Sequence, residues 1–226
     1  MRLRNRNILQ VIKQQIAADR PVLWFNSLTL ALLIALAFYA KVFDQGEGIV
    51  LLFEDPFIQT RPYIGILTGV SEIFWCFSVA ICTFSLILLK KIRPHGPLDR
   101  FLLCSVVGIA ILLLDDVFRS TLMLNVFFGI PKPMVYLTYS VAALAYIFTF
   151  WHRIVQSTPY LLLLMAALLF MFSTAVDVLH LVGQGAPAML EDGTKLLGLV
   201  NLILYFWHVC QREIFRALRA VQHEAI

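Results

Sequence analysis

Six long apolar segments constrain this chain more than any other feature, because about 20 mostly apolar residues in a helix span a lipid bilayer. A bilayer offers no water to satisfy backbone N–H and C=O groups, so such segments must be helical. They run over residues 22–43, 63–89, 101–118, 134–151, 160–182 and 191–210. We therefore expect an all-α, polytopic integral membrane bundle with six transmembrane spans.

The composition supports a bilayer as the solvent. The chain is 60% hydrophobic and 14% charged, whereas a soluble domain is about 45–50% apolar and about 25% charged. The prolines fall between the apolar segments or at their edges, where a residue without a backbone donor costs least. The four cysteines lie inside apolar runs without a CxxC pair, which favours buried thiols over a metal site.

The basic residues predict the orientation, because loops rich in Lys and Arg stay in the cytoplasm. One side of the predicted topology holds 13 of the 18 Lys and Arg residues but only 4 of the 14 Asp and Glu residues. An even number of spans places both basic ends of the chain on that side. We expect both termini in the cytoplasm, with a bacterial inner (plasma) membrane as the expected location.

Three regions follow from these patterns. Residues 1–20 carry apolar residues at helical spacing among basic ones, which predicts an amphipathic helix on the membrane surface. Residues 21–211 form the six-span domain, and residues 212–226 form a basic cytoplasmic tail. Two apolar stretches on the outer side, residues 49–53 and 120–129, are expected to lie along the surface or fold back into it.

A short sequence similarity within the chain suggests that helical hairpins are repeated. The third span ends in Asp-Val-Phe-Arg at residues 116–119, and the fifth ends in Asp-Val-Leu-His at residues 177–180. The fourth and sixth spans share a Phe-Trp-His sequence. Duplication of one hairpin and chance matching in a Phe- and Leu-rich chain are both open interpretations.

The ionisable residues of the spans gather in the outer half of the predicted membrane. Each costs roughly 2.5–3.5 kcal/mol at mid-membrane on insertion scales, so such residues face the bundle interior and mark candidate sites. The candidate ligands are Glu72, Asp115, Asp116, Asp177, His180 and Glu191, and the candidate charge-pairing residues are Arg119 and Lys195. Carboxylates with one imidazole predict a site for a divalent metal cation or for proton exchange.

Helical spacing predicts local pairs, because residues three or four apart share a helix face. These pairs are Asp116 with Arg119, Asp177 with His180, and Glu191 with Lys195. Glu72 has no opposite charge within four residues. Its partner must therefore come from another helix, or the side chain must be protonated. A network of structural ion pairs is the competing interpretation of the whole cluster.

Three functions remain open at this stage. The first is binding and transport of a cation, a metal or a proton, and the second is metal-dependent hydrolysis of a lipid-type substrate inside the membrane. The single histidine of the cluster argues against a zinc hydrolase. The third is a non-catalytic accessory subunit. The expected partners are the lipid bilayer and either a second copy or another membrane protein, and no nucleic acid is expected.

Overall fold

The structure is a computed structural model that describes residues 20–43, 46–53, 65–93, 98–179 and 186–224, and every element in these ranges is a helix. Six of the helices are long and apolar enough to span a membrane. They are α2 (Arg20–Phe43), α4 (Ile66–Ile92), α5 (Arg100–Phe118), α7 (Lys132–Ser157), α8 (Tyr160–Leu179) and α9 (Ala186–Glu224). The chain is thus a multi-pass membrane helix bundle, as predicted. The predicted surface helix at residues 1–20 falls almost entirely outside the described residues.

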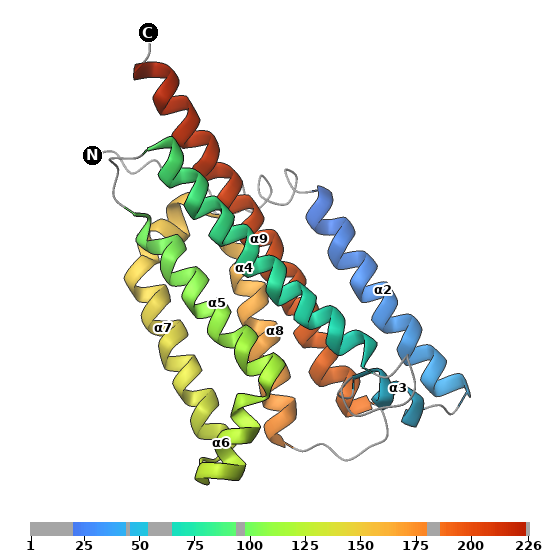
Figure 1. Cartoon of the computed structure of the whole chain (residues 1–226). Coiled ribbons are helices and arrows are strands. Elements are labelled where there is room, and N and C mark those ends of the chain that lie inside the picture. Colours follow the sequence, from blue (N-terminus) through green and yellow to red (C-terminus); the bar gives the residue numbers. More distant parts are fainter. Residues whose placement is uncertain (1–19, 44–45, 54–64, 94–97, 180–185, 225–226) are drawn as a thin grey trace.

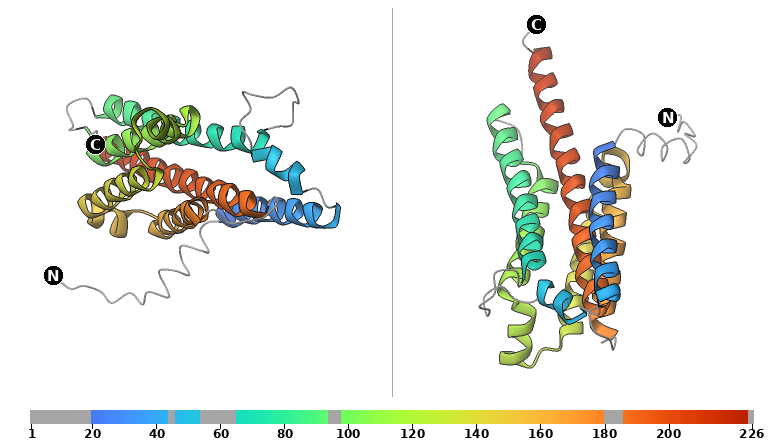
Figure 2. Two further views of the ribbon diagram at one scale, coloured as in Figure 1. Left: turned by 90° about the horizontal axis from the view of Figure 1, so that it is seen from below. Right: turned by 90° about the vertical axis from the view of Figure 1, so that its right-hand side faces the viewer.

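Helix α9 is the centre of the bundle. It lies between a layer made of α4 and α5 and a layer made of α2 and α8 (Figures 1 and 2). Leu199 and Tyr205 of α9 are fully buried, whereas most apolar side chains of α2 and α7 are exposed. The buried face of a central helix packs against protein on both sides, and the exposed faces of the outer helices are suited to lipid.

Helix α4 packs against α9 through small side chains. Ser71, Ser78 and Ser85 recur every seven residues on α4, and all three are buried. The hydroxyls of Ser78 and Ser85 donate to backbone carbonyls one turn earlier in the same helix. Between them, Cys82 forms a thiol–thiol hydrogen bond with Cys210 of α9. Small residues at this spacing let two membrane helices approach closely.

Helix α2 is attached to α9 by a pair of amides. Asn26 Nδ2 donates to Asn201 Oδ1 over 3.2 Å, and Asn201 Nδ2 donates to Asn26 Oδ1 over 2.8 Å. Nearby, the Leu33 side chain lies over Gly193 of α9. Reciprocal amide hydrogen bonds between membrane helices are worth about 1 kcal/mol. They fix the register of a helix that otherwise faces outward.

The two apolar stretches between spans form short helices, as expected for segments that fold back. Helix α3 (Gly46–Phe53) is tied to the start of α4 by hydrogen bonds from Gly65 N to Leu51 O and from Thr68 Oγ1 to Phe53 O, each 2.9 Å. Helix α6 (Ser120–Phe128) follows α5 directly. Both lie at the same end of the bundle, and the described chain begins and ends at the other (Figure 1). The assignment of that other end to the cytoplasm stays a prediction.

Candidate functional site

The acidic residues of α5, α8 and α9 meet at the α6 end of the bundle, where they form what we call the carboxylate layer. Its members are the acids Asp115, Asp116, Asp177, Glu191 and Asp192 and the bases Arg119, Lys132 and Lys195. The layer exists because α5 and α8 end at this level, while α7 and α9 begin there.

Asp115 has a local structural role. It lies in the last turn of α5, and Arg119 adopts a left-handed conformation (φ 49°) that turns the chain into α6. The carboxylate of Asp115 accepts hydrogen bonds from Thr121 N over 2.7 Å and from Thr121 Oγ1 over 2.8 Å. It thereby satisfies a backbone donor in the first turn of α6, as a capping side chain does.

Among the described residues, only one of the two carboxylate oxygens of Asp116 has a hydrogen-bond donor. Lys195 of α9 donates to its Oδ1 atom. The Oδ2 atom is buried and has no hydrogen-bond partner among the described residues. A buried carboxylate oxygen without a donor is costly, so this atom is the point where the layer can accept a proton, a water molecule or a small cation.

Asp177 is held by two residues of α7. Tyr136 Oη donates to Asp177 Oδ2 over 2.7 Å, and Lys132 Nζ lies 3.3 Å from Oδ1. Lys132 and Tyr136 are four residues apart, so they share one face of α7. Both oxygens of this carboxylate therefore have donors.

Glu191 and Asp192 join the two ion pairs into one electrostatic unit. Glu191 lies within electrostatic range of Asp177, Lys132 and Lys195, and Asp192 lies within range of Asp116, Asp177 and Lys195. Arg119 also acts on Asp192. The five acids and three bases leave two negative charges uncompensated when all of them are ionised, which is expensive in a medium of low dielectric constant.

The sequence predicted the members of the layer better than it predicted their partners. Lys195 is a charge-pairing residue as expected, but it binds Asp116 of another helix, whereas the spacing suggested Glu191 of its own helix. The sequence did not predict Lys132 and Tyr136 as partners of Asp177, because they are more than 40 residues away from it in the chain. His180, the other predicted partner of Asp177, lies outside the described residues.

Glu72 remains a predicted member. It is half-buried on α4 and takes part in an interaction. We define the carboxylate layer by the contacts of α5, α7, α8 and α9 and leave Glu72 outside that definition.

The predicted divalent-metal site has no support in this arrangement. Among the residues that the structure describes, no group of three or more His, Cys, Asp or Glu side chains is arranged to hold a metal ion. Asp116 and Asp177 instead receive lysine ammonium groups, and Asp115 receives Thr121. A metal ion would have to displace these donors. A metal-dependent hydrolase would also need a set of metal-binding side chains of this kind.

A second ionic cluster lies at the opposite end of the bundle. Arg153 of α7 binds Asp99 through two hydrogen bonds of 2.6 and 2.7 Å, and its guanidinium lies 4.7 Å from the centre of the Phe101 ring. Asp99 also accepts from the backbone N–H groups of Phe101 and Leu102 at the start of α5. Glu213 of α9 lies 3.3 Å from the same guanidinium. Each acid of this cluster is bound by Arg153, and the cluster therefore holds α5, α7 and α9 together.

The comparison with protein-family models finds a match over most of the chain. Residues 23–209, which cover four spans and most or part of the other two, match the model of a family described as Domain of unknown function (DUF8692). The searches of curated proteins and of solved structures gave no match.

Proposed function

Because the chain belongs to the DUF8692 family, whose description assigns no activity, we propose a function from the geometry: the protein binds protons at the carboxylate layer, with Asp116 as the principal acceptor. The observation that carries this proposal is the buried Oδ2 atom of Asp116, which lacks a hydrogen-bond partner in the described structure. The layer has five acids and three bases, so a proton taken up there lowers its net negative charge.

The neighbours of Asp116 would set how readily the proton binds. Asp192 repels the ionised form of Asp116, and Lys195 stabilises it. Glu191 and Asp192 belong to the same electrostatic unit, so their charges influence proton uptake at Asp116. The oxygens of Asp177 and Asp115 already accept hydrogen bonds, and these two residues contribute to the electrostatic field of the layer.

We propose that the layer binds protons, and we do not extend this to proton transport. Movement of a proton across the membrane needs polar groups in the other half of the bundle. The buried hydroxyls of Ser78 and Ser85 there donate to carbonyls of their own helix, which is a packing role. Transport would require a path that includes residues outside this arrangement.

Infrared spectroscopy of the purified protein in nanodiscs tests the proposal. The C=O stretch of a protonated carboxylic acid should appear as the pH is lowered, and it should be lost or shifted in Asp116→Asn. The matched control is Glu213→Gln, which removes a carboxylate at the other end of the bundle and should keep the band. If no titrating band depends on Asp116 or Asp192, the proposal fails. If sodium or potassium ions suppress the band at constant pH, the layer exchanges a small cation for the proton.

A structural role is the second candidate, and the lysine pairs favour it. Asp116 and Asp177 are each bound by a lysine from another helix, which is how a packing network in an accessory subunit would be built. Under this alternative, an apolar pair in place of Asp116 and Lys195 should be neutral or stabilising, as is common for buried ion pairs. It should also leave the infrared titration unchanged.

A further inference from the structure

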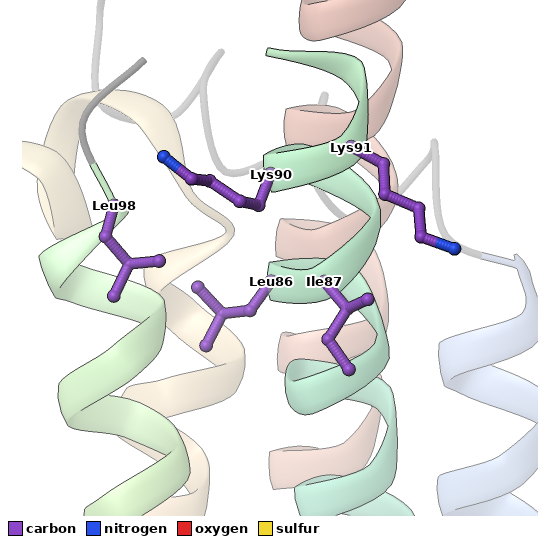
Figure 3. Close-up of a pocket in the computed structure, with 5 residues that line it drawn as sticks. All are labelled: Leu86, Ile87, Lys90, Lys91 and Leu98. Atoms are coloured by element: carbon purple, nitrogen blue, oxygen red, sulfur yellow. The ribbon is translucent and has the colours of Figure 1, made fainter. Parts of the chain in front are cut away.

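A groove of about 330 Å³ lies beside the C-terminal end of α4, at the opposite end of the bundle from the carboxylate layer. It is lined by Leu86, Ile87, Lys90 and Lys91 of α4 and by Leu98, which precedes α5 (Figure 3). In Figure 3 the Leu98 and Leu86 side chains face the gap between the two helices, and Lys90 reaches across its upper edge toward Leu98.

The groove is apolar at one end and positively charged at the other, which matches the apolar chain and the charged headgroup of a lipid. Apolar side chains form the part nearer the membrane centre, and two lysines form the part nearer the end of α4, which closes at Ile92. Lysines at this position extend their amines to the level of the phosphates while their methylene groups stay in the apolar region. Ile87 is 55% exposed, so the groove opens toward the surrounding lipid.

The neighbouring charges leave this end of the bundle positive. A smaller hollow shares Leu86, Lys90 and Leu98 with the groove and is also lined by Arg93, Asp99 and Glu213. Both acids are bound by Arg153, and Glu213 also receives Arg216 over 3.0 Å. Among the described residues that line the two hollows or pair with their acids, five bases outnumber two acids, so their electrostatic field favours an anion.

From this charge complementarity we propose that the groove is a binding site for an anionic glycerophospholipid. One acyl chain lies along Leu86, Ile87 and Leu98, and the phosphate is bound by Lys90. Lys91, whose amine points away from Leu98 in Figure 3, adds positive potential near the phosphate. The positive-inside pattern of the sequence places this lipid in the cytoplasmic leaflet. The site is independent of the carboxylate layer and of the function proposed for it.

Native mass spectrometry of the detergent-solubilised protein tests the site, with phosphatidylglycerol and phosphatidylcholine titrated separately. The wild type should retain phosphatidylglycerol and gain thermal stability from it, and phosphatidylcholine should do neither. The double variant Lys90→Gln/Lys91→Gln should bind phosphatidylglycerol roughly thirtyfold more weakly, which corresponds to about 2 kcal/mol at about 1 kcal/mol per basic residue.

Two further variants separate a defined site from general attraction. Arg212→Gln/Arg219→Gln removes the same charge from exposed positions of α9 that do not line the groove, and it should bind phosphatidylglycerol like the wild type. Ile87→Trp fills the groove, keeps both lysines and should lose the lipid. Soluble glycerol 3-phosphate should not compete, because it lacks the acyl chain.

Several results would overturn the proposal. Equal losses in the lysine pair and the arginine pair would mean that only the overall positive charge attracts lipid. Equal binding of phosphatidylcholine would remove the role of the lysines, and undiminished binding by Ile87→Trp would remove the role of the groove. Competition by glycerol 3-phosphate at the concentration of the lipid would identify a simple phosphate site.

Discussion

Lys195 of α9 binds Asp116 of α5, 79 residues earlier in the chain, and this pair has a counterpart. Lys132 of α7 binds Asp177 of α8, 45 residues later. The acid of each predicted hairpin is therefore bound by a lysine from the other hairpin. Two related hairpins packed side by side would exchange partners in this way, so the arrangement agrees with the predicted repeat, which remains a prediction.

The first prediction concerns the Lys195–Asp116 pair. Lys195→Met should lower the free energy of unfolding by about 1–3 kcal/mol, because it leaves a half-buried carboxylate without a donor. Asp116→Asn on that background should recover much of the loss, since the uncompensated charge is gone. Thermal denaturation in detergent measures the double-mutant cycle. Additive effects of the two substitutions would show that the residues are not coupled.

The second prediction concerns Asp99 and Arg153. Asp99→Ala removes both the cap of α5 and the partner of Arg153, so unfolding should become easier by about 1–3 kcal/mol. Arg153→Lys should also be destabilising, because an ammonium group cannot form the two parallel hydrogen bonds of a guanidinium. Chemical denaturation measures both. Arg100→Gln, at the exposed neighbouring position, is the control and should change little.

The third prediction concerns the contact of α8 with α9. A Cβ atom at Gly198 would lie 3.2 Å from the Phe170 ring, whereas a Cβ at Gly108 of α5 would meet nothing within 4 Å. Gly198→Val should therefore destabilise the bundle by about 1–3 kcal/mol through overpacking. Gly108→Val makes the same change of residue type in open space and should be nearly neutral. Similar melting temperatures for the two variants would contradict the packing of Phe170 on α9.

The fourth prediction concerns the accessibility of the cysteines. Cys76 and Cys104 are exposed, whereas Cys82 and Cys210 are buried and hydrogen-bonded to each other. A small maleimide should leave Cys82 and Cys210 unmodified in folded, detergent-solubilised protein and should modify all four cysteines after denaturation, as read by peptide mass spectrometry. Rapid labelling of Cys82 in the folded protein would show that α4 and α9 do not pack as described.

The short apolar stretches show how far local pattern can predict the fold. Residues 49–53 and 120–129 are too short to cross a membrane but too apolar for a loop, and they form α3 and α6 beside the spans. The length of α9 was harder to predict. Its 39 residues continue as one helix through the basic tail, because nothing in the tail breaks helical hydrogen bonding.

The sequence also predicted most of the residues that belong to the candidate site. Asp116 and Asp177 belong to the same layer because each lies in the last turns of a span, and Glu191 belongs to it because it opens the next one. The predicted metal site has no support in the described structure, because carboxylates at the same depth in the membrane need not point toward a common metal position. Side chains from α7, above all Lys132 and Tyr136, occupy the oxygens that a metal would need.

By itself, the sequence determined the number of spans, their helical form and the end of the bundle at which the acids gather. These properties depend on the transfer of each segment from water to lipid, which is a local sum over about 20 residues. Only the tertiary structure decided which helix lies at the centre, which lysine binds which aspartate and which carboxylate oxygen lacks a donor. Those features depend on contacts between residues far apart in the chain, and the hydropathy of a segment carries no information about them.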